Sequence, residues 1–444
     1  MAEWGIKGYL FENWAQTYKC IPELYFTPKT KEDVIQILEQ ARAGGKTVRA
    51  VGGARSPSDI CCTDGYMIDM QRMDSVIDVC AEKCQITVEG GVMLTKLNRI
   101  LEENGMAISV LGAISDITLA GAMATGTHGS GAQYGVLASY VVKLELLTAS
   151  GEVMTLSREK DEDMFRAAAV SLGALGIILT VTLQCEKAFK LCKTSFTTTM
   201  DDVLENLEVH VRSSEHFRFM WIPYTGHVIA THANRTDKKI AVHSSWFWET
   251  LVGYHMLEFM LWISTYFTSM VPYIARFMYN ILWRHGGEMV DTSYKVFNFN
   301  CLFKQYVNEW SIPRSQAVLV LLELQEWILA QEHRLQVHFP IEVRFVKADD
   351  LLLSPCSEID SCYINIIMFR PYGRDTPHQE YWDKYESIMK RAGGRPHWAK
   401  AHRETASDLR KMYPHFEQFC NIRSSLDPHG LFLNNYLKRI LEYK

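Results

Sequence analysis

A glycine-rich run at residues 110–135, VLGAISDITLAGAMATGTHGSGAQYG, constrains the fold of this chain more than any other stretch. Small residues and hydroxyls stand where an ordinary core element would carry bulky side chains. Such a run lets backbone approach a ligand closely and exposes N–H donors, which suits a cofactor that bears phosphate. A glycine-rich surface loop would have a similar composition. The flanking sequence decides between these two interpretations.

Two further glycine-rich turns flank the central run. The turn at residues 51–56, VGGARS, directly follows a predicted strand at 47–51, and the turn at 171–176, SLGALG, precedes a predicted strand at 177–183. Three separate backbone turns predict one large cofactor held by loops. None of them has the strand, GxGxxG and helix order of a dinucleotide-binding Rossmann unit, and no GxxxxGK[ST] run for a nucleoside triphosphate is present.

The pattern around these turns predicts an α+β domain. Thr30 and Asp33 form a capping-box pattern, apolar residues follow at helical spacing, and Gly44 and Gly45 end the helix. Further helices are predicted at 94–101 and 163–170, and further strands at 85–88, 141–148 and 152–156.

Composition excludes several classes of function. The net charge is −5 without a basic block, so nucleic acid is not expected as a partner. The 11 cysteines lack metal-ligand spacing and predict free thiols in a reducing compartment. A length of 444 residues with 48% hydrophobic residues allows two or three domains with sizeable cores.

From residue 188 onward, amphipathic helices alternate with strands, for example a helix at 201–212 and strands at 217–221, 336–345 and 362–370. Within this part, residues 246–283 are unusually apolar and aromatic, but Glu249, Glu258 and Arg276 interrupt them. A spanning helix needs about 20 predominantly apolar residues, and Pro272 breaks the longest uncharged run. Buried core helices, an interfacial aromatic hairpin and a true span all remain open.

Two charged clusters are candidate catalytic groups. Glu342 and Arg344 lie two apart on a predicted strand, so their side chains share one face, although an exposed charge pair would give the same pattern. His397 and Lys400 lie in HWAKAH, and His402, which ends it, also fits a polar core residue. Two histidines five apart do not share a helix face as metal ligands at i and i+4 do, so we expect no metal site.

Five motifs together carry a family resemblance: VGGARSPSD, AGAMATGTHGSG, EVR at 342–344, HWAKAH at 397–402 and SPCSEIDSCYINIIMFRPYG at 354–373. They resemble, in order and nearly end to end, the aldonolactone oxidoreductases of the vanillyl-alcohol-oxidase flavoprotein superfamily. The resemblance implies an α+β, two-domain FAD-binding fold. Residues 1–187 would bind FAD, residues 188–392 would form an α+β cap on the substrate side, and residues 393–444 would return to the flavin site.

The resemblance also implies an activity: oxidation of the C2 hydroxyl of L-gulono-1,4-lactone to a keto lactone that tautomerises to L-ascorbate, with dioxygen reduced to hydrogen peroxide. Glu342 would bind substrate hydroxyls, and Arg344 would orient the lactone and stabilise negative charge on it and on the flavin. Lys400 would be a cation facing substrate or flavin, and His397 a proton-handling or orienting group. The expected FAD-binding residues are Val51, Gly52, Gly53, Ala54, Arg55, Ser56, Gly112, Ser115, Asp116, Thr118, Gly121, Thr127, His128, Gly129, Ser130, Gly173, Gly176 and Ile178.

Alternatives of the same fold are a galactono- or arabinono-lactone oxidase or dehydrogenase, with cytochrome c as one electron acceptor, and a flavin-binding protein without catalysis. One departure from the family supports the last: Arg55 occupies the position expected to hold a histidine bonded to the flavin. A guanidinium cannot make that bond, so we expect noncovalent FAD. Gly112 stands where a dehydrogenase of the family carries alanine, which favours access of dioxygen, although a backbone turn alone would also explain it.

The resemblance further implies an endoplasmic-reticulum (microsomal) membrane location. Residues 246–283 are the expected means of attachment, because Trp, Tyr and Phe are enriched at membrane interfaces.

Overall fold

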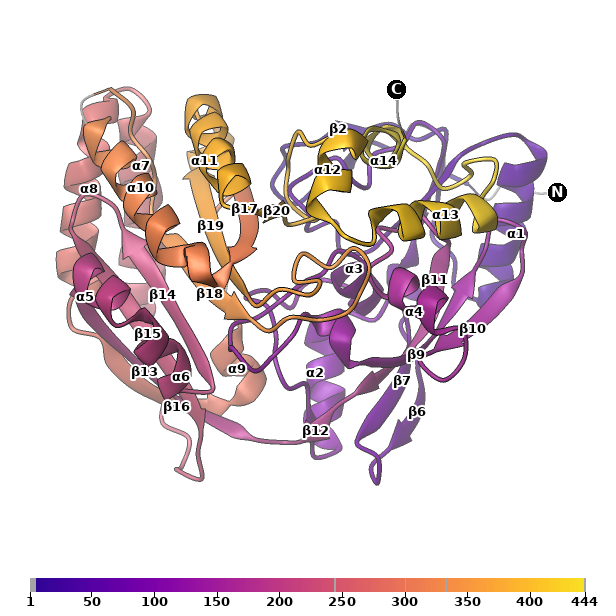
Figure 1. The fold of residues 1–444 in the computed structure, drawn as a ribbon, viewed down its shortest axis with the longest axis horizontal. Helices are drawn as coiled ribbons and strands as arrows, with labels where there is room; N and C mark the ends of the chain where they lie inside the picture. Colours follow the sequence, from indigo (N-terminus) through magenta and orange to yellow (C-terminus); the bar gives the residue numbers. More distant parts are fainter. Residues whose placement is uncertain (1–4, 243–244, 300, 332–333, 443–444) are drawn as a thin grey trace.

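The computed structural model describes residues 5–242, 245–299, 301–331 and 334–442. Figure 1 shows two lobes side by side, with the N-terminal part of the chain in one and the middle part in the other. The C-terminal helices return to the first lobe: α12 (Ala406–Met412), α13 (Phe416–Leu426) and α14 (Asn435–Leu441). Residues 1–4 of the predicted FAD-binding segment (1–187) and residues 443–444 of the predicted C-terminal segment (393–444) lie outside the described residues.

Two sheets build the first lobe. A parallel sheet has the order β3 (Leu24–Phe26), β5 (Tyr66–Asp69), β4 (Val48–Val51). An antiparallel sheet has the order β10 (Val153–Ser157), β9 (Val141–Leu147), β11 (Ile177–Gln184), β7 (Gln85–Glu89), β6 (Val76–Cys80). The helices of this part are α1 (Lys31–Ala43), α2 (Leu94–Glu103), α3 (Leu119–Ala124) and α4 (Glu162–Ala169).

Helix α1 shows how local sequence sets these elements. Thr30 accepts a hydrogen bond from the backbone N–H of Asp33, and the Asp33 carboxylate accepts one in return, so the predicted capping box is confirmed. The apolar positions at helical spacing bury Val34 and Ile37 completely. The chain leaves the helix at Gly44 and turns at Gly45, whose φ of +63° favours glycine.

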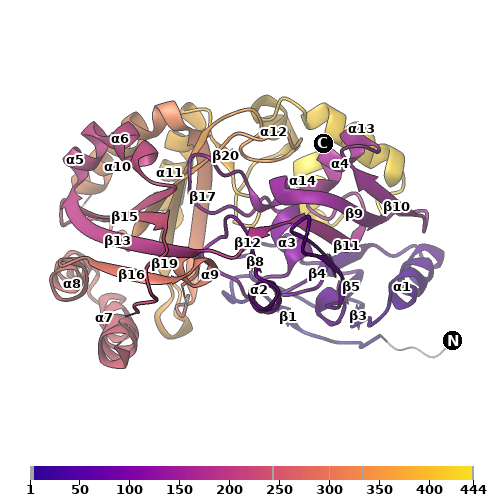
Figure 2. The same ribbon diagram turned by 90° about the horizontal axis from the view of Figure 1, so that it is seen from below.

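An eight-stranded antiparallel sheet builds the second lobe (Figure 2). Its order is β16 (Gly287–Thr292), β13 (Lys190–Thr199), β15 (His227–Arg235), β14 (His216–Ile222), β18 (Ile341–Val346), β19 (Ser361–Phe369), β17 (Gln305–Pro313), β20 (Arg395–Pro396). The last strand comes from the C-terminal segment, which therefore joins this sheet before it returns to the first lobe.

Alternation along the strands gives this sheet two different faces. Val343 and Ile364 are buried in the core that α10 (Ala317–Ala330) and α11 (Gln379–Arg391) share with the sheet. Glu342 and Arg344 therefore point away from that core. The predicted helix at 201–212 is two helices, α5 (Met200–Glu205) and α6 (Leu207–Ser213), because the backbone leaves helical geometry at Asn206 (φ −105°, ψ 18°).

The aromatic segment 246–283 folds as a helical hairpin on the second lobe. It consists of a π-helical stretch (Phe247–Met256), α7 (Leu257–Ser264), a short turn (Thr268–Met270), α8 (Val271–Met278) and a second π-helical stretch (Tyr279–Trp283). Side chains such as Leu261 and Ala275 are buried in the core of the lobe. Over the described residues, no helix has both the length and the hydropathy that crossing a bilayer requires.

Candidate active site: a cavity between the lobes

The three glycine-rich turns meet at a cavity of about 460 Å³, and the second lobe forms its other wall. The cavity is lined by these predicted cofactor residues: Val51, Gly52, Gly53, Ala54, Arg55, Ser56, Gly112, Thr118, Gly121, Thr127, His128, Gly173, Gly176 and Ile178. The predicted catalytic residues Glu342, Arg344, His397 and Lys400 line it as well. The fold thus brings together sequence stretches that lie more than 300 residues apart.

Glycine is required where the turns touch. A Cβ on Gly52 would lie 2.0 Å from Oγ1 of Thr118, and one on Gly53 would lie 2.8 Å from the carbonyl oxygen of Asp116. The first turn therefore packs on the central run through bare backbone. Gly176 has a φ of +154° and a Cβ there would meet the Leu147 carbonyl at 2.4 Å. These backbone walls, open to a large cavity, fit a long cofactor such as FAD, which residues 51–56, 112–128 and 173–178 would hold.

Four predicted cofactor residues do not line the large cavity. Ser115 hydrogen-bonds Asn98 and Asn298 away from it, and Asp116 pairs with Arg55. The backbone of Gly129 packs against Leu111. The contacts of these three residues thus help to pack the glycine-rich run within the protein.

Ser130, the fourth, ties the glycine-rich run to the second lobe. Its hydroxyl donates to the carbonyl of Phe217 on β14 and accepts from the N–H of Phe345 on β18 at 3.1 Å. Beside it, the N–H of Gly131 donates to the Phe345 carbonyl at 2.7 Å. The strand that carries Glu342 and Arg344 is thereby fixed relative to the cofactor turns.

Arg55 is held in place at the cavity wall. Its Nη2 lies 2.8 Å from a carboxylate oxygen of Asp116, and its guanidinium lies over the ring of Trp14 at 5.2 Å from the ring centre. Arg55 thus joins the first turn to the central run through an ion pair.

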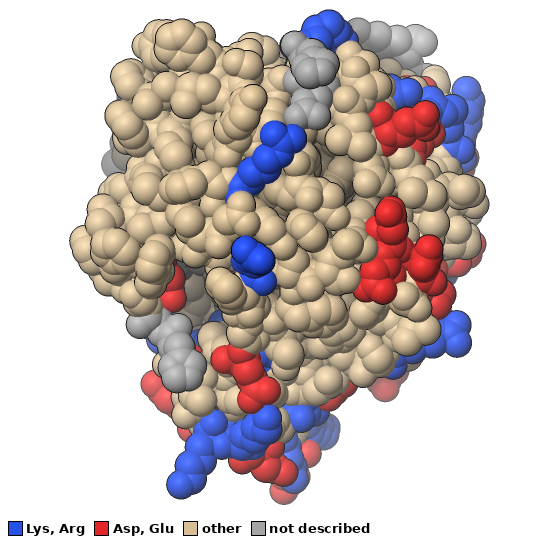
Figure 3. Space-filling model, turned by 90° about the vertical axis from the view of Figure 1, so that its left-hand side faces the viewer, with Lys and Arg blue, Asp and Glu red and all other residues tan. Residues whose placement is uncertain are grey.

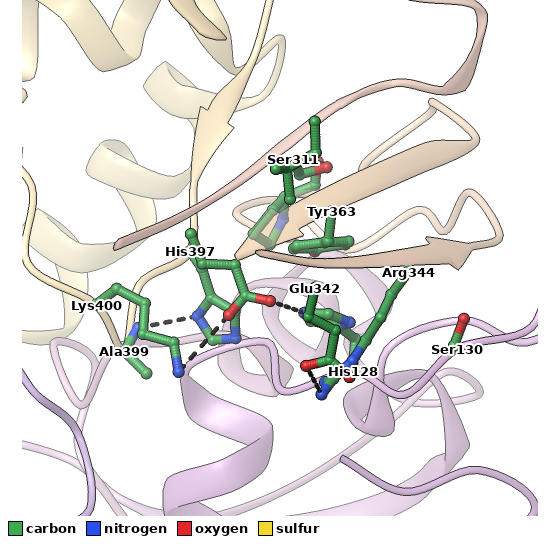
Figure 4. A network of polar contacts seen from close by, with 12 residues as sticks. His128, Ser130, Ser311, Glu342, Arg344, Tyr363, His397, Ala399 and Lys400 are labelled. Atoms are coloured by element: carbon green, nitrogen blue, oxygen red, sulfur yellow. Dashed lines mark hydrogen bonds and ion pairs between the residues drawn. The ribbon is translucent and has the colours of Figure 1, made fainter. Parts of the chain in front are cut away.

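Glu342 lies between two arginines. Arg344 donates to its Oε2 (Figure 4), and Nη1 of Arg218 lies 3.2 Å from its Oε1. Glu342 and Arg344 are each only 8% exposed, so the alternative of an exposed charge pair is wrong. Burial lowers the pKa of Arg218 despite Glu342, whereas Glu342 and Glu309 outweigh burial and raise the pKa of Arg344. Two arginines thus share one carboxylate, so the three side chains have a formal net charge of +1.

Glu309 is a second buried carboxylate that sequence analysis missed. Its Oε1 lies 3.3 Å from Nε2 of His128, and its Oε2 lies 3.6 Å from Nζ of Lys400. Burial raises its pKa, but Lys400 and His128 outweigh burial, so the pKa lies well below its ordinary value. Glu309 therefore stays ionised and holds Lys400 and His128 in position. The missed signal was a charged residue inside an apolar strand, as it was for Arg218 in HFRFMWI.

His397 and His402 differ in role. The N–H of Ala399 donates to Nδ1 of His397 at 3.1 Å, which leaves Nε2 of that ring as the protonated nitrogen. Burial holds the pKa of His397 well below its ordinary value, so the ring is neutral. His402 hydrogen-bonds the Tyr436 hydroxyl at 2.9 Å, does not line the cavity, and burial lowers its pKa to about 3. It is a core histidine.

His128, Glu309 and His397 place possible metal ligand atoms within 4.8 Å of one another. A ligating histidine needs a free lone pair, but in His397 the lone pair of Nδ1 accepts the Ala399 N–H. In His128 both ring nitrogens already have oxygen partners, Nδ1 the Gly129 carbonyl at 2.9 Å and Nε2 the Glu309 carboxylate at 3.3 Å. With Lys400 as a further partner of Glu309, the arrangement favours a hydrogen-bonded charge cluster over a metal centre.

Two family models match this chain. The family model described as "FAD binding domain" matches residues 22–157, and the model for D-arabinono-1,4-lactone oxidase matches residues 181–440. L-gulonolactone oxidase of Mus musculus is 49% identical over 98% of this chain and 99% of its own length. L-gulono-1,4-lactone dehydrogenase of Mycobacterium tuberculosis is 34% identical over 97% of this chain and 99% of its own.

Solved structures agree on the fold. Cholesterol oxidase from Brevibacterium sterolicum superposes with a TM-score of 0.84 over 98% of this chain and 97% of that one, at 16% identity. The predicted two-domain, FAD-binding α+β fold is therefore confirmed.

Proposed function

This chain belongs to the D-arabinono-1,4-lactone oxidase family, and from that premise we propose that it is an FAD-dependent oxidase of L-gulono-1,4-lactone that forms L-ascorbate. The observation that carries this function is the wall of the cavity opposite the cofactor turns. There Arg344 pairs with Glu342 and Lys400 pairs with Glu309, and both carboxylates are buried. Arg218, which does not line this cavity, holds the second oxygen of Glu342.

Bound FAD would accept the hydride that leaves C2 of the lactone. The residues of the chain do the remaining work. Arg344 presents a planar donor, held by Glu342, to the oxygen on which negative charge develops. Lys400, fixed by Glu309, places a second positive charge in the same wall. A preorganised pair of cations in a buried wall stabilises such a charge without rearrangement during the reaction.

His397 contributes as a hydrogen-bond donor. Because its Nδ1 accepts the Ala399 N–H, the ring can offer an Nε2–H but no second lone pair. We therefore propose that His397 orients the substrate and does not accept its proton.

The FAD is proposed to be noncovalent. Arg55 stands at the position expected to carry the linking histidine, and its guanidinium is engaged by Asp116. Acid precipitation of the holoprotein should leave the yellow colour in the supernatant. Flavin fluorescence that stays with the protein band on a denaturing gel would remove this proposal.

Dioxygen is proposed as the electron acceptor, and Gly112, which lines the cavity, as the position that gives it access. The relatives include proteins named as oxidases and as dehydrogenases, so the acceptor has to be measured. The competing explanation for Gly112, a purely structural glycine, has support as well. A Cβ there would lie 3.2 Å from Cγ2 of Thr127 and 3.3 Å from the carbonyl oxygen of His128.

We also propose attachment to the endoplasmic-reticulum membrane through residues 246–283. The outer side of the hairpin exposes large aromatic side chains, with Trp246 67%, Phe267 63% and Tyr273 69% exposed. Figure 3 shows a broad area of this side of the molecule with few charged side chains. Gly253, Leu257 and Trp283 of the same hairpin line the cavity, so a membrane there would lie close to the active site.

Arabinono- and galactono-lactones are the alternative substrates, and relatives named D-arabinono-1,4-lactone oxidase are 30–31% identical. Anaerobic addition of each lactone to the holoprotein decides the matter, because only a substrate bleaches the flavin. Bleaching by L-gulono-1,4-lactone supports the proposal. If no aldonolactone bleaches the flavin, the protein binds flavin without this catalysis.

A further inference from the structure

Asn365 occupies the centre of the charged wall. The strand register places it directly opposite Glu342 on β18 and directly opposite Glu309 on β17. Residues directly opposite in neighbouring strands project to the same face of a sheet, about 5 Å apart. The carboxamide therefore lies between the two carboxylates that hold Arg344 and Lys400, and all three side chains line the cavity.

Of the three side chains Glu342, Asn365 and Glu309, the Asn365 carboxamide is the one without a partner among the described residues. Glu342 is engaged by Arg344 and Arg218. Glu309 is engaged by Lys400 and His128. Among the described residues, the Asn365 side chain has neither a hydrogen bond nor an ion pair with another residue, and it is half-buried. A half-buried amide in a cavity wall with free donors and a free acceptor is suited to bind a polar group of a ligand.

The strand that carries Asn365 also limits where that group can lie. Ile367 and Phe369 follow on the same face of β19 and line the cavity, and both are apolar. The polar wall therefore ends at Asn365. A ligand that reaches Arg344 and Lys400 with one oxygen would place its neighbouring oxygen beside Asn365.

We propose that Asn365 binds the C3 hydroxyl of the lactone, next to the reacting C2 hydroxyl, and sets the preference between lactones that differ there. The inference rests on the proposed function. An amide both donates and accepts, so it can bond a hydroxyl that also donates to Glu342 or Glu309, which only accept. L-gulono- and L-galactono-1,4-lactone differ in configuration at C3, and they therefore test this contact directly.

The test uses FAD-loaded Asn365→Leu, which removes both hydrogen-bonding functions at similar volume. Ile366→Leu, on the same strand but with its side chain buried in the core on the opposite face, is the matched control. For each protein the lactone concentration that half-bleaches the flavin anaerobically, and the limiting rate, are measured with both lactones. Loss of one neutral hydrogen bond is worth about a tenfold change in affinity.

We expect about a tenfold higher half-bleaching concentration for L-gulono-1,4-lactone in Asn365→Leu, with a smaller change for L-galactono-1,4-lactone and a limiting rate within about threefold. Ile366→Leu should match the unmodified protein. Equal changes for both lactones, or none, would overturn the proposal. If Asn365→Leu loses FAD, Asn365→Ala replaces it with the same criteria. Failure of the unmodified protein to bleach with any aldonolactone would instead contradict the proposed function.

Discussion

Arg344 donates to the carboxylate of Glu342, two residues earlier on the same strand, and both side chains are buried in the wall of the cavity. The pair brings a fixed guanidinium to the substrate side, because the remaining carboxylate oxygen is held by Arg218 at 3.2 Å. When one member of a buried ion pair is removed, the other charge is left without compensation.

Arg344→Lys and Arg344→Ala should lower the rate of lactone oxidation by about 10²–10³ while FAD stays bound. Lysine replaces the planar fork by a point charge and cannot hold Glu342 and a lactone oxygen in the same way. Flavin content and anaerobic bleaching rates measure the two effects separately. Unchanged bleaching in Arg344→Ala would show that Arg344 does not act on the substrate.

Glu309→Gln should destabilise the protein at neutral pH by about 3 kcal/mol, because Lys400 loses its counter-charge and His128 loses its carboxylate partner. The pKa of Glu309 lies well below its ordinary value of 4.5, so its ionised form stabilises the fold above pH 4.5. That contribution disappears as the pH falls through the lower pKa of the folded state. The difference in unfolding free energy between the two proteins should therefore shrink in acid.

Glu386→Gln is the control for this experiment. Glu386 is also a buried carboxylate of the second lobe, hydrogen-bonded to Asn308, but burial raises its pKa. Its substitution should have the opposite dependence on pH, since the neutral form is favoured in the folded protein. A constant difference for Glu309→Gln between pH 7 and acid would show that Glu309 is not held ionised.

Gly112→Ala tests access of dioxygen to the cavity. If the glycine is the gate, oxygen should reoxidise the flavin much more slowly in the variant, while anaerobic bleaching by lactone stays the same. Because the new methyl group would press on Thr127 at 3.2 Å, Thr127→Ser combined with Gly112→Ala provides the control for crowding. Equally fast reoxidation in all three proteins would leave Gly112 with a structural role alone.

Replacing Phe267 and Tyr273 by serine should release the protein from vesicles that contain endoplasmic-reticulum lipids, because both side chains are exposed on the aromatic hairpin. Ile77→Ser with Val209→Ser, at exposed apolar positions elsewhere, is the matched control. Vesicle flotation measures binding. If the unmodified protein does not float with the vesicles, the membrane proposal fails.

Much of this site could be predicted from local sequence. The glycines predicted the cofactor turns, because close contacts such as that of Gly52 with Thr118 leave no room for a side chain. The i, i+2 spacing of Glu342 and Arg344 fixed their common face. For Arg218 and Glu309 the local signal was only a charged residue within a strand. That Arg218 meets Glu342, and that Glu309 lies in the same wall, depends on the order β14, β18, β19, β17, which no local pattern encodes.

The roles of four cofactor candidates were also beyond sequence analysis. Ser115, Asp116, Gly129 and Ser130 have the residue types of a phosphate cradle. In the fold the side chains of Ser115, Asp116 and Ser130 also bond to other parts of the protein, and Gly129 packs against Leu111. Whether such a side chain bonds to a cofactor or to the protein depends on hydrogen-bond partners that lie far away in the sequence. The pairing of Ser130 with Phe217 and Phe345 is one such case.

The most direct test of the central claim is the stoichiometry of the reaction in air. Holoprotein with L-gulono-1,4-lactone should consume dioxygen and form hydrogen peroxide and L-ascorbate in equal amounts, without another electron acceptor. Formation of L-ascorbate only when cytochrome c or an artificial acceptor is added, or no L-ascorbate under either condition, would contradict the account.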